Sequence, residues 1–319
     1  MKGKKMVDIY KALGMTSVDG SLMAGDILKQ PEIDVIIGQL VDYKNPLRQN
    51  LVRKTGEGSA WIINRRAVGE TGAQWILDTD TIQEDQGKYT QVSFTYKTLG
   101  AKGKVTRKLQ AVGRSYANIL ADEIEAQAID FKNTEDLGII VGDATANAKQ
   151  FDGLKILIPV SQAIFAGGSG VAAGGALTLS KMDQVVDKAV YGPDMIITSR
   201  KIRRSLNALL QANQRFIDKV EIKGGFKVMA YNDIPIYTST NCVDTQTYDG
   251  FTVTAETGGS KSSLYVVDTE QTWIGVLTEV SIMPLAKSSS QFDEFDLFED
   301  EALVVRNYLG NAKIIGITG

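Results

Sequence analysis

The pattern of apolar and polar residues changes character several times along the chain. Residues 1–57 contain short helix-compatible patches interrupted by glycine and proline, which predicts an extended arm with short helical pieces. From residue 58, the segments SAWIINRRAV and KYTQVSFTYKTLGAKGKVTRKLQ are rich in β-branched and aromatic residues and flank a polar stretch. This composition predicts a long two-stranded excursion with a projecting tip. Such a hairpin cannot bury both faces alone, so we expect it to lie on another surface.

Residues 115–138 carry the clearest helical pattern. Ser115 is a plausible N-cap and Gly138 a plausible stop. Apolar residues recur at spacings of four, four, four and three and form one stripe: Tyr116, Leu120, Ile124, Ala128 and Phe131. The pattern predicts a rod about 36 Å long.

The stretch VGDATANAKQFDGL, residues 141–154, follows that helix directly. Gly142 and Gly153 give the backbone freedom, and Asp143 can bond its own turn. Two interpretations of the stretch are open at this point: a hinge between two building blocks, or a catalytic or phosphate loop with Asp143 as the catalytic residue.

A mixed α/β region comes next. Periodicity predicts strands at 153–160, 193–199 and 234–241 and helices at 180–190 and 200–216. From residue 262 onward the pattern is again typical of strands. The fold class predicted from this order is α+β.

The composition excludes several common classes of active site. The 319 residues carry a net charge of −3 and include no histidine, so histidine-based triads and histidine-ligated metal centres are excluded. Cys242 is the single cysteine and is expected to be a packed residue. The glycine-rich segment 166–179 does not fit the dinucleotide fingerprint and is read as a surface loop. The segment FDEFDLFEDE lacks the EF-hand spacing, and its phenylalanines suggest packing. The sequence predicts no catalytic, cofactor or metal site.

The order of parts resembles major capsid proteins with the HK97 fold, from tailed bacteriophages. The resemblance is carried by GDAT (142–145) and FDGL (151–154) after the helix, by DIPIY (233–237), and by the closing strands from residue 278. It implies an N-terminal arm (1–57), an extended hairpin or E-loop (58–110), and a peripheral domain with a spine helix (111–150). An axial domain (151–261) and returning peripheral strands (262–319) follow, with the axial domain an alternative place for the last strand.

The same resemblance implies a function. The chain would be a homo-oligomer of hexamers and pentamers that encloses double-stranded DNA without specific recognition, in a virion assembled in the host cytoplasm. Scaffold, portal or decoration proteins are further expected partners, and neither an enzymatic activity nor a membrane is expected. The alternatives are an encapsulin-type nanocompartment shell and a carboxylate-based α/β hydrolase.

Charge distribution suggests where neighbouring copies meet. Between Lys44 and Lys108 there are twelve Lys/Arg residues against six acids, whereas between Asp268 and Glu301 there are nine acids and one base. We hypothesise that the basic flanks of the hairpin rest on the acidic domain of a neighbour, with two unrelated solvated faces as the alternative. The intersubunit residues expected from this hypothesis and from the need to cover tryptophan are Trp61, Arg65, Arg66, Trp75, Lys88, Asp293, Glu294, Asp296 and Glu299.

Overall fold

A computed structural model describes residues 46–66, 75–78, 88–113, 119–212, 218–222, 226–285 and 291–319. Residues 1–45 of the expected N-terminal arm therefore lie outside the described residues, and residues 46–57 are described. The chain divides into two compact units, each treated by itself below: Met1–Asp42, Gly100–Asp130 and Ile282–Leu297 in the first, and Tyr43–Leu99, Phe131–Ser281 and Phe298–Gly319 in the second. Among the described residues, no helix is long and apolar enough to cross a membrane.

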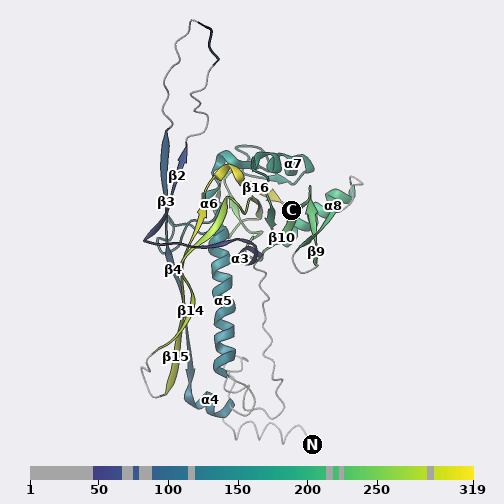
Figure 1. The fold of residues 1–319 in the computed structure, drawn as a ribbon. Helices are drawn as coiled ribbons and strands as arrows, with labels where there is room; N and C mark the ends of the chain where they lie inside the picture. Colours follow the sequence, from purple (N-terminus) through teal and green to yellow (C-terminus); the bar gives the residue numbers. More distant parts are fainter. Residues whose placement is uncertain are drawn as a thin grey trace, which may run out of the picture. The chain divides into compact units, whose positions relative to one another are not determined.

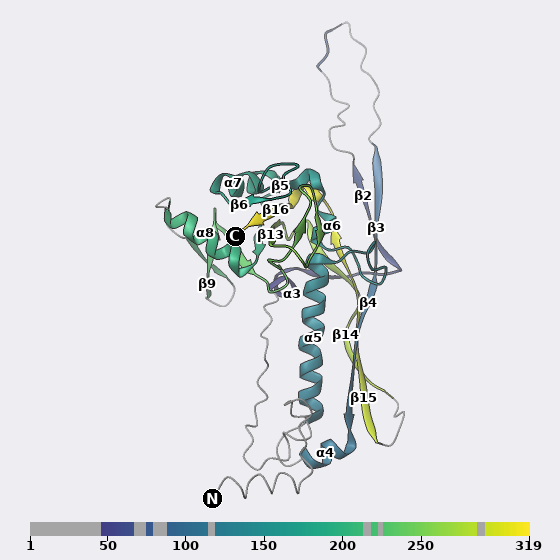
Figure 2. The same ribbon diagram turned by 180° about the vertical axis from the view of Figure 1, so that it is seen from behind.

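The second unit is built on an eight-stranded sheet with the order β5-β16-β13-β7-β10-β9-β8, to which β6 adds by pairing with β16 (Figures 1 and 2). The strands are β5 (Ala163–Phe165), β6 (Gly175–Ala176), β7 (Met195–Thr198), β8 (Asp218–Ile222), β9 (Phe226–Tyr231), β10 (Ile234–Thr238), β13 (Lys261–Val267) and β16 (Ala312–Thr318). The pairs β7–β10 and β5–β16 are parallel, whereas β13 is antiparallel to both of its neighbours. The strands predicted at 193–199 and 234–241 are confirmed.

Successive side chains of the central strands enter two separate cores. Ile196, Leu264 and Val266 pack in one core with residues of α7 (Leu179–Lys188) and α8 (Arg200–Ala212). Their chain neighbours, such as Ile197 and Tyr265, pack in the other core. A sheet buried on both faces explains why these strands read as continuous apolar runs. Both predicted helices of this region are confirmed.

The second core joins segments that are far apart in the chain. It contains Leu47 of α3 (Pro46–Asn50), Ile139 and Ile140 of α5 (Ile119–Val141), and Leu154 of α6 (Leu154–Leu157). Cys242 is 5% exposed in this core, as expected of a packed residue, and burial raises the pKa of its thiol.

The rest of the sheet structure comprises a four-stranded sheet and two hairpins. The sheet has the order β1-β14-β15-β4, with β1 (Arg53–Thr55), β14 (Thr272–Pro284), β15 (Phe292–Val305) and β4 (Lys97–Thr106). Strand β1 is parallel to β14. The predicted excursion is present as β2 (Ala60–Arg66) and β3 (Tyr89–Thr95), which pair antiparallel from Ala60 opposite Thr95 to Arg66 opposite Tyr89. A shorter hairpin joins β11 (Thr247–Tyr248) and β12 (Val253–Ala255).

One predicted boundary and one predicted element type are wrong. Helix α5 does not stop at Gly138 but continues to Val141. The strand predicted at 153–160 is instead the short helix α6 followed by a 3₁₀ turn at Val160–Gln162. A short apolar run cannot be assigned to strand or helix by periodicity, and here Pro159 ends the helical turn.

The predicted hinge, residues 142–153, lies within the second unit and is held by its own backbone and carboxylates. Asp143 accepts from the N–H groups of Thr145 and Ala146 at 2.9 and 3.1 Å, and Asp152 accepts from Ala144 N–H at 2.9 Å. The Gly153 N–H donates to the Gly142 carbonyl at 2.8 Å. Asp143 is thus engaged in the turn predicted for it.

The described part of the first unit includes α4 (Arg107–Gly113), the first part of α5, and the ends of β4, β14 and β15. The Phe295 ring packs against Gly103, so that a Cβ added to Gly103 would lie only 2.1 Å from that ring. Gln110 Nε2 donates to Asp293 at 2.9 Å. These contacts link β4 and α4 to β15, which is distant from them in the chain.

Candidate assembly surface and buried charge cluster

The hairpin presents large apolar side chains to solvent. Trp75 is fully exposed and Leu77 is 73% exposed, with Ile76 also exposed beside them. On the two strands of the hairpin, Ile62 of β2 and Tyr89 of β3 are more than half exposed. An apolar surface of this kind marks an interaction site in a folded protein.

Trp61, at the base of the hairpin, packs inside its own chain. Its ring meets Trp273 edge to face, and it contributes to a core formed by Phe94, Ala302 and Val304. Trp61 is thus covered by residues of its own chain. Trp75 is the hairpin tryptophan that still needs a partner.

The basic residues of β2 differ in their surroundings. Arg65 donates to the carbonyl oxygens of Arg306 and Val305, and its guanidinium lies 5.8 Å from the ring centroid of Tyr308. Burial lowers the pKa of Arg65. Arg66 and Lys88 have exposed side chains at the outer end of the strands. Arg65 is therefore bonded within its own chain, and the side chains of Arg66 and Lys88 are exposed.

The acidic residues expected at the surface are also divided. Glu294 is nearly buried and forms ion pairs with Lys102 at 2.9 Å and Lys104 at 3.6 Å within the first unit. Asp293 and Asp296 are half-buried in the same strand. Part of the basic-to-acidic pairing that we assigned to neighbours thus occurs inside one chain.

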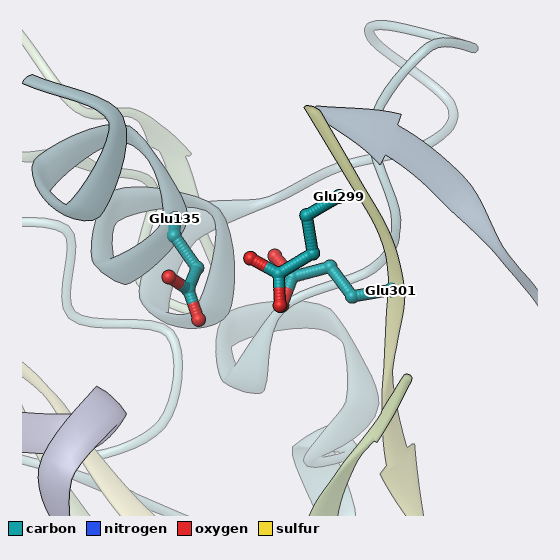
Figure 3. Close-up of side chains that lie close together, drawn as sticks. All are labelled: Glu135, Glu299 and Glu301. Carbon is teal, nitrogen blue, oxygen red and sulfur yellow. The ribbon is translucent and has the colours of Figure 1, made fainter. Parts of the chain in front are cut away.

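Glu299 corrects the sequence interpretation most clearly. Its side chain is fully buried and pairs with the Arg53 guanidinium, so it cannot lie on an exposed acidic face. Together with Glu135 and Glu301 it forms a cluster of three buried carboxylates, whose oxygens lie within 4.8 Å of one another. Figure 3 shows the carboxylates from α5 and β15 turned toward each other.

Two arginines compensate part of this charge. Arg53 donates to both Glu135 and Glu299 and lies 3.7 Å from Glu301 Oε2. Arg48 forms an ion pair with Glu135 and lies 3.7 Å from Glu299 Oε2. Desolvation, followed by the Glu299 charge, raises the pKa of Glu301 to about 8. We call these five residues the junction cluster, since it fastens residues 46–55 to α5 and β15.

Sequence reasoning missed four members of the junction cluster: Arg48, Arg53, Glu135 and Glu301. One signal was available, because Glu299 and Glu301 are two positions apart in a strand and must share a face. No sequence signal related them to Glu135, which belongs to a helix more than 160 positions earlier.

Comparison with known proteins places the fold. A search of curated protein sequences finds no match. Among solved structures, the holo-SrpI encapsulin complex from Synechococcus elongatus PCC 7942 is similar with a TM-score of 0.68 and 10% identity, covering 91% of this chain and 93% of that one. The capsid of a native GTA particle has a TM-score of 0.65 and 12% identity, covering 91% and 95%.

A third similar structure is that of Mycobacterium phage Bobi, with a TM-score of 0.63 and 13% identity, covering 90% of this chain and 95% of that one. The fold is thus the HK97-like capsid fold expected from the sequence. A sequence profile described as the phage capsid family matches residues 25–295. Because that match covers most of the chain, the protein belongs to the phage capsid family and is a capsid shell protein.

Proposed function

We propose that copies of this chain self-assemble, as hexamers and pentamers, into the closed icosahedral head that encloses the double-stranded DNA of a tailed phage. Assembly takes place in the host cytoplasm, with scaffold, portal and decoration proteins as the expected partners. The single observation that carries the proposal is the exposed apolar strip Trp75, Ile76 and Leu77 on the hairpin.

The energetic argument starts from that strip. Fully burying a side chain such as Leu or Ile contributes roughly 1.5–3 kcal/mol, and tryptophan has still more apolar area to bury. A soluble monomer gains nothing from leaving these groups in water. A neighbouring copy that covers the strip gains this free energy of burial, and the gain is repeated at every position of a lattice.

Charge gives the contact its orientation. Arg66 and Lys88 are exposed on the hairpin, and Asp293 and Asp296 are the acidic residues that we propose they approach on a neighbour. Each exposed pair is worth only about 0–1 kcal/mol, so it sets register more than affinity. The domain boundaries implied by the family resemblance are part of the same proposal, with residues 151–261 near the capsomer centres.

The test is the assembly state of purified protein, measured by light scattering and electron microscopy. We expect wild-type protein to form closed megadalton particles and the Trp75→Ser/Leu77→Ser variant to remain as small oligomers. The matched control is Val190→Ser, which removes a 67% exposed apolar side chain elsewhere. Particles of normal yield from the hairpin variant would refute the role of the strip, and a stable wild-type monomer would refute the shell.

The encapsulin-type compartment is the second candidate, favoured by the similarity to the SrpI encapsulin structure. The contents of purified particles separate the two. Long nuclease-protected DNA supports the phage head, whereas a folded enzyme inside the particles supports the compartment.

A further inference from the structure

The junction cluster contains carboxylate oxygens that its arginines do not satisfy. Neither oxygen of Glu301 receives a hydrogen bond within the described residues, and the same holds for Glu299 Oε2. Both side chains are fully buried and directed into the cluster (Figure 3). Burying a carboxylate oxygen without a hydrogen-bond donor costs free energy. The unsatisfied oxygens therefore indicate that a ligand is missing from the cluster.

The net charge of the cluster favours binding of a cation. At the rim, Glu279 is 65% exposed with its Oε2 3.5 Å from Arg53 Nη1. With this residue the cluster has four carboxylates against two guanidiniums, which leaves two negative charges when all are ionised. One divalent cation balances that excess.

The donor atoms identify the class of ion. All of them are carboxylate oxygens, which suit hard cations such as Ca²⁺ and Mg²⁺. The chain has no histidine, and Cys242 lies outside the cluster, so the nitrogen and sulfur ligands typical of zinc sites are absent from it.

We propose that Glu135, Glu299 and Glu301 bind one divalent cation of the Ca²⁺ or Mg²⁺ type. The ion joins a residue of α5 to two residues of β15, next to Arg48 and Arg53. Its binding therefore fastens α5 to β15, while its charge competes with the two arginines that attach the 46–55 segment. The inference is independent of the proposed shell function.

The experiment uses the full-length protein, stripped with EDTA and titrated with CaCl₂ or MgCl₂ in a calorimeter, with thermal unfolding in parallel. We expect one ion bound per chain and a higher unfolding midpoint with the ion. Glu301→Gln, which keeps the shape of the side chain, is expected to weaken binding at least tenfold. Asp300→Asn is the matched control, because its side chain alternates to the other face and accepts from Thr98.

A second variant separates binding from folding. Arg48→Gln removes a competing positive charge, so we expect it to bind the ion at least threefold more tightly, the opposite of what structural damage would do. No binding of either ion to wild-type protein, or equal affinity in Glu301→Gln, overturns the proposal. Unchanged or weaker binding in Arg48→Gln also overturns it. Particle formation is scored separately, so failure of the shell and failure of the cation site are distinguishable.

Discussion

The indole rings of Trp61 and Trp273 meet edge to face, with centroids 5.9 Å apart and planes inclined by 70°. Trp61 belongs to the hairpin and Trp273 to β14, so this contact fixes the base of the hairpin to the body of its unit. Lys54 adds its ammonium 3.6 Å from the Trp273 ring centroid. Edge-to-face pairs contribute about 0.5–1.5 kcal/mol beyond the area that they bury.

The first prediction concerns Trp273. Trp273→Ala is expected to lower the free energy of unfolding by about 3–5 kcal/mol, because it empties a core position that is 4% exposed. Trp273→Phe is expected to cost less, about 1–3 kcal/mol, because the indole N–H has no hydrogen-bond partner to lose within the described residues. Chemical denaturation measures both. Equal losses for alanine and phenylalanine would contradict the packing argument.

A second prediction tests the ion pairs of the junction cluster. Arg53→Gln leaves Glu135 and Glu299 buried without their shared guanidinium, and we expect a loss of about 3–5 kcal/mol in the free energy of unfolding. The control is Glu279→Gln, whose exposed carboxylate is expected to change stability by less than about 1 kcal/mol. A cost for Arg53→Gln as small as that of the control would show that the pairs contribute little.

The pH dependence of stability follows from Glu301. Its pKa is raised from 4.5 to about 8 in the folded protein, so between these values the folded state holds a proton that the unfolded state has released. This contribution to stability is fully present below pH 4.5 and is lost as pH rises through about 8. Unfolding midpoints measured in EDTA across this range are expected to fall more steeply for wild-type protein than for Glu301→Gln. Identical slopes would contradict the assignment.

The hinge offers a matched pair of glycine substitutions. A Cβ on Gly142 would come 2.4 Å from the carbonyl oxygens of Gly138 and Phe151, so Gly142→Ala is expected to cost about 1–3 kcal/mol. At Gly138, inside α5, a Cβ would lie 3.4 Å from the Phe151 ring. We expect Gly138→Ala to be neutral or to stabilise by up to about 1 kcal/mol. Thermal unfolding that ranks the two variants in the reverse order would refute this account of the hinge.

Local patterns were sufficient for most of the elements. The β-branched composition of 59–68 and 88–110 predicted the hairpin, and the apolar positions of α7 and α8 predicted helices that pack on the sheet. Asp143 was assigned to a turn because its side chain bonds its own backbone. These features depend on interactions within a few residues, which a sequence displays directly.

The sequence by itself thus determined the fold class, the turn at Asp143 and the family. Only the tertiary structure decided that Glu299 is buried, because its partner Arg53 lies 246 positions away in the chain. It also decided that α5 continues past Gly138 to Val141, where the ring of Phe151, 13 positions later in the chain, packs beside Gly138. Burial depends on which distant segments meet, and the period of apolar residues carries no information about that choice.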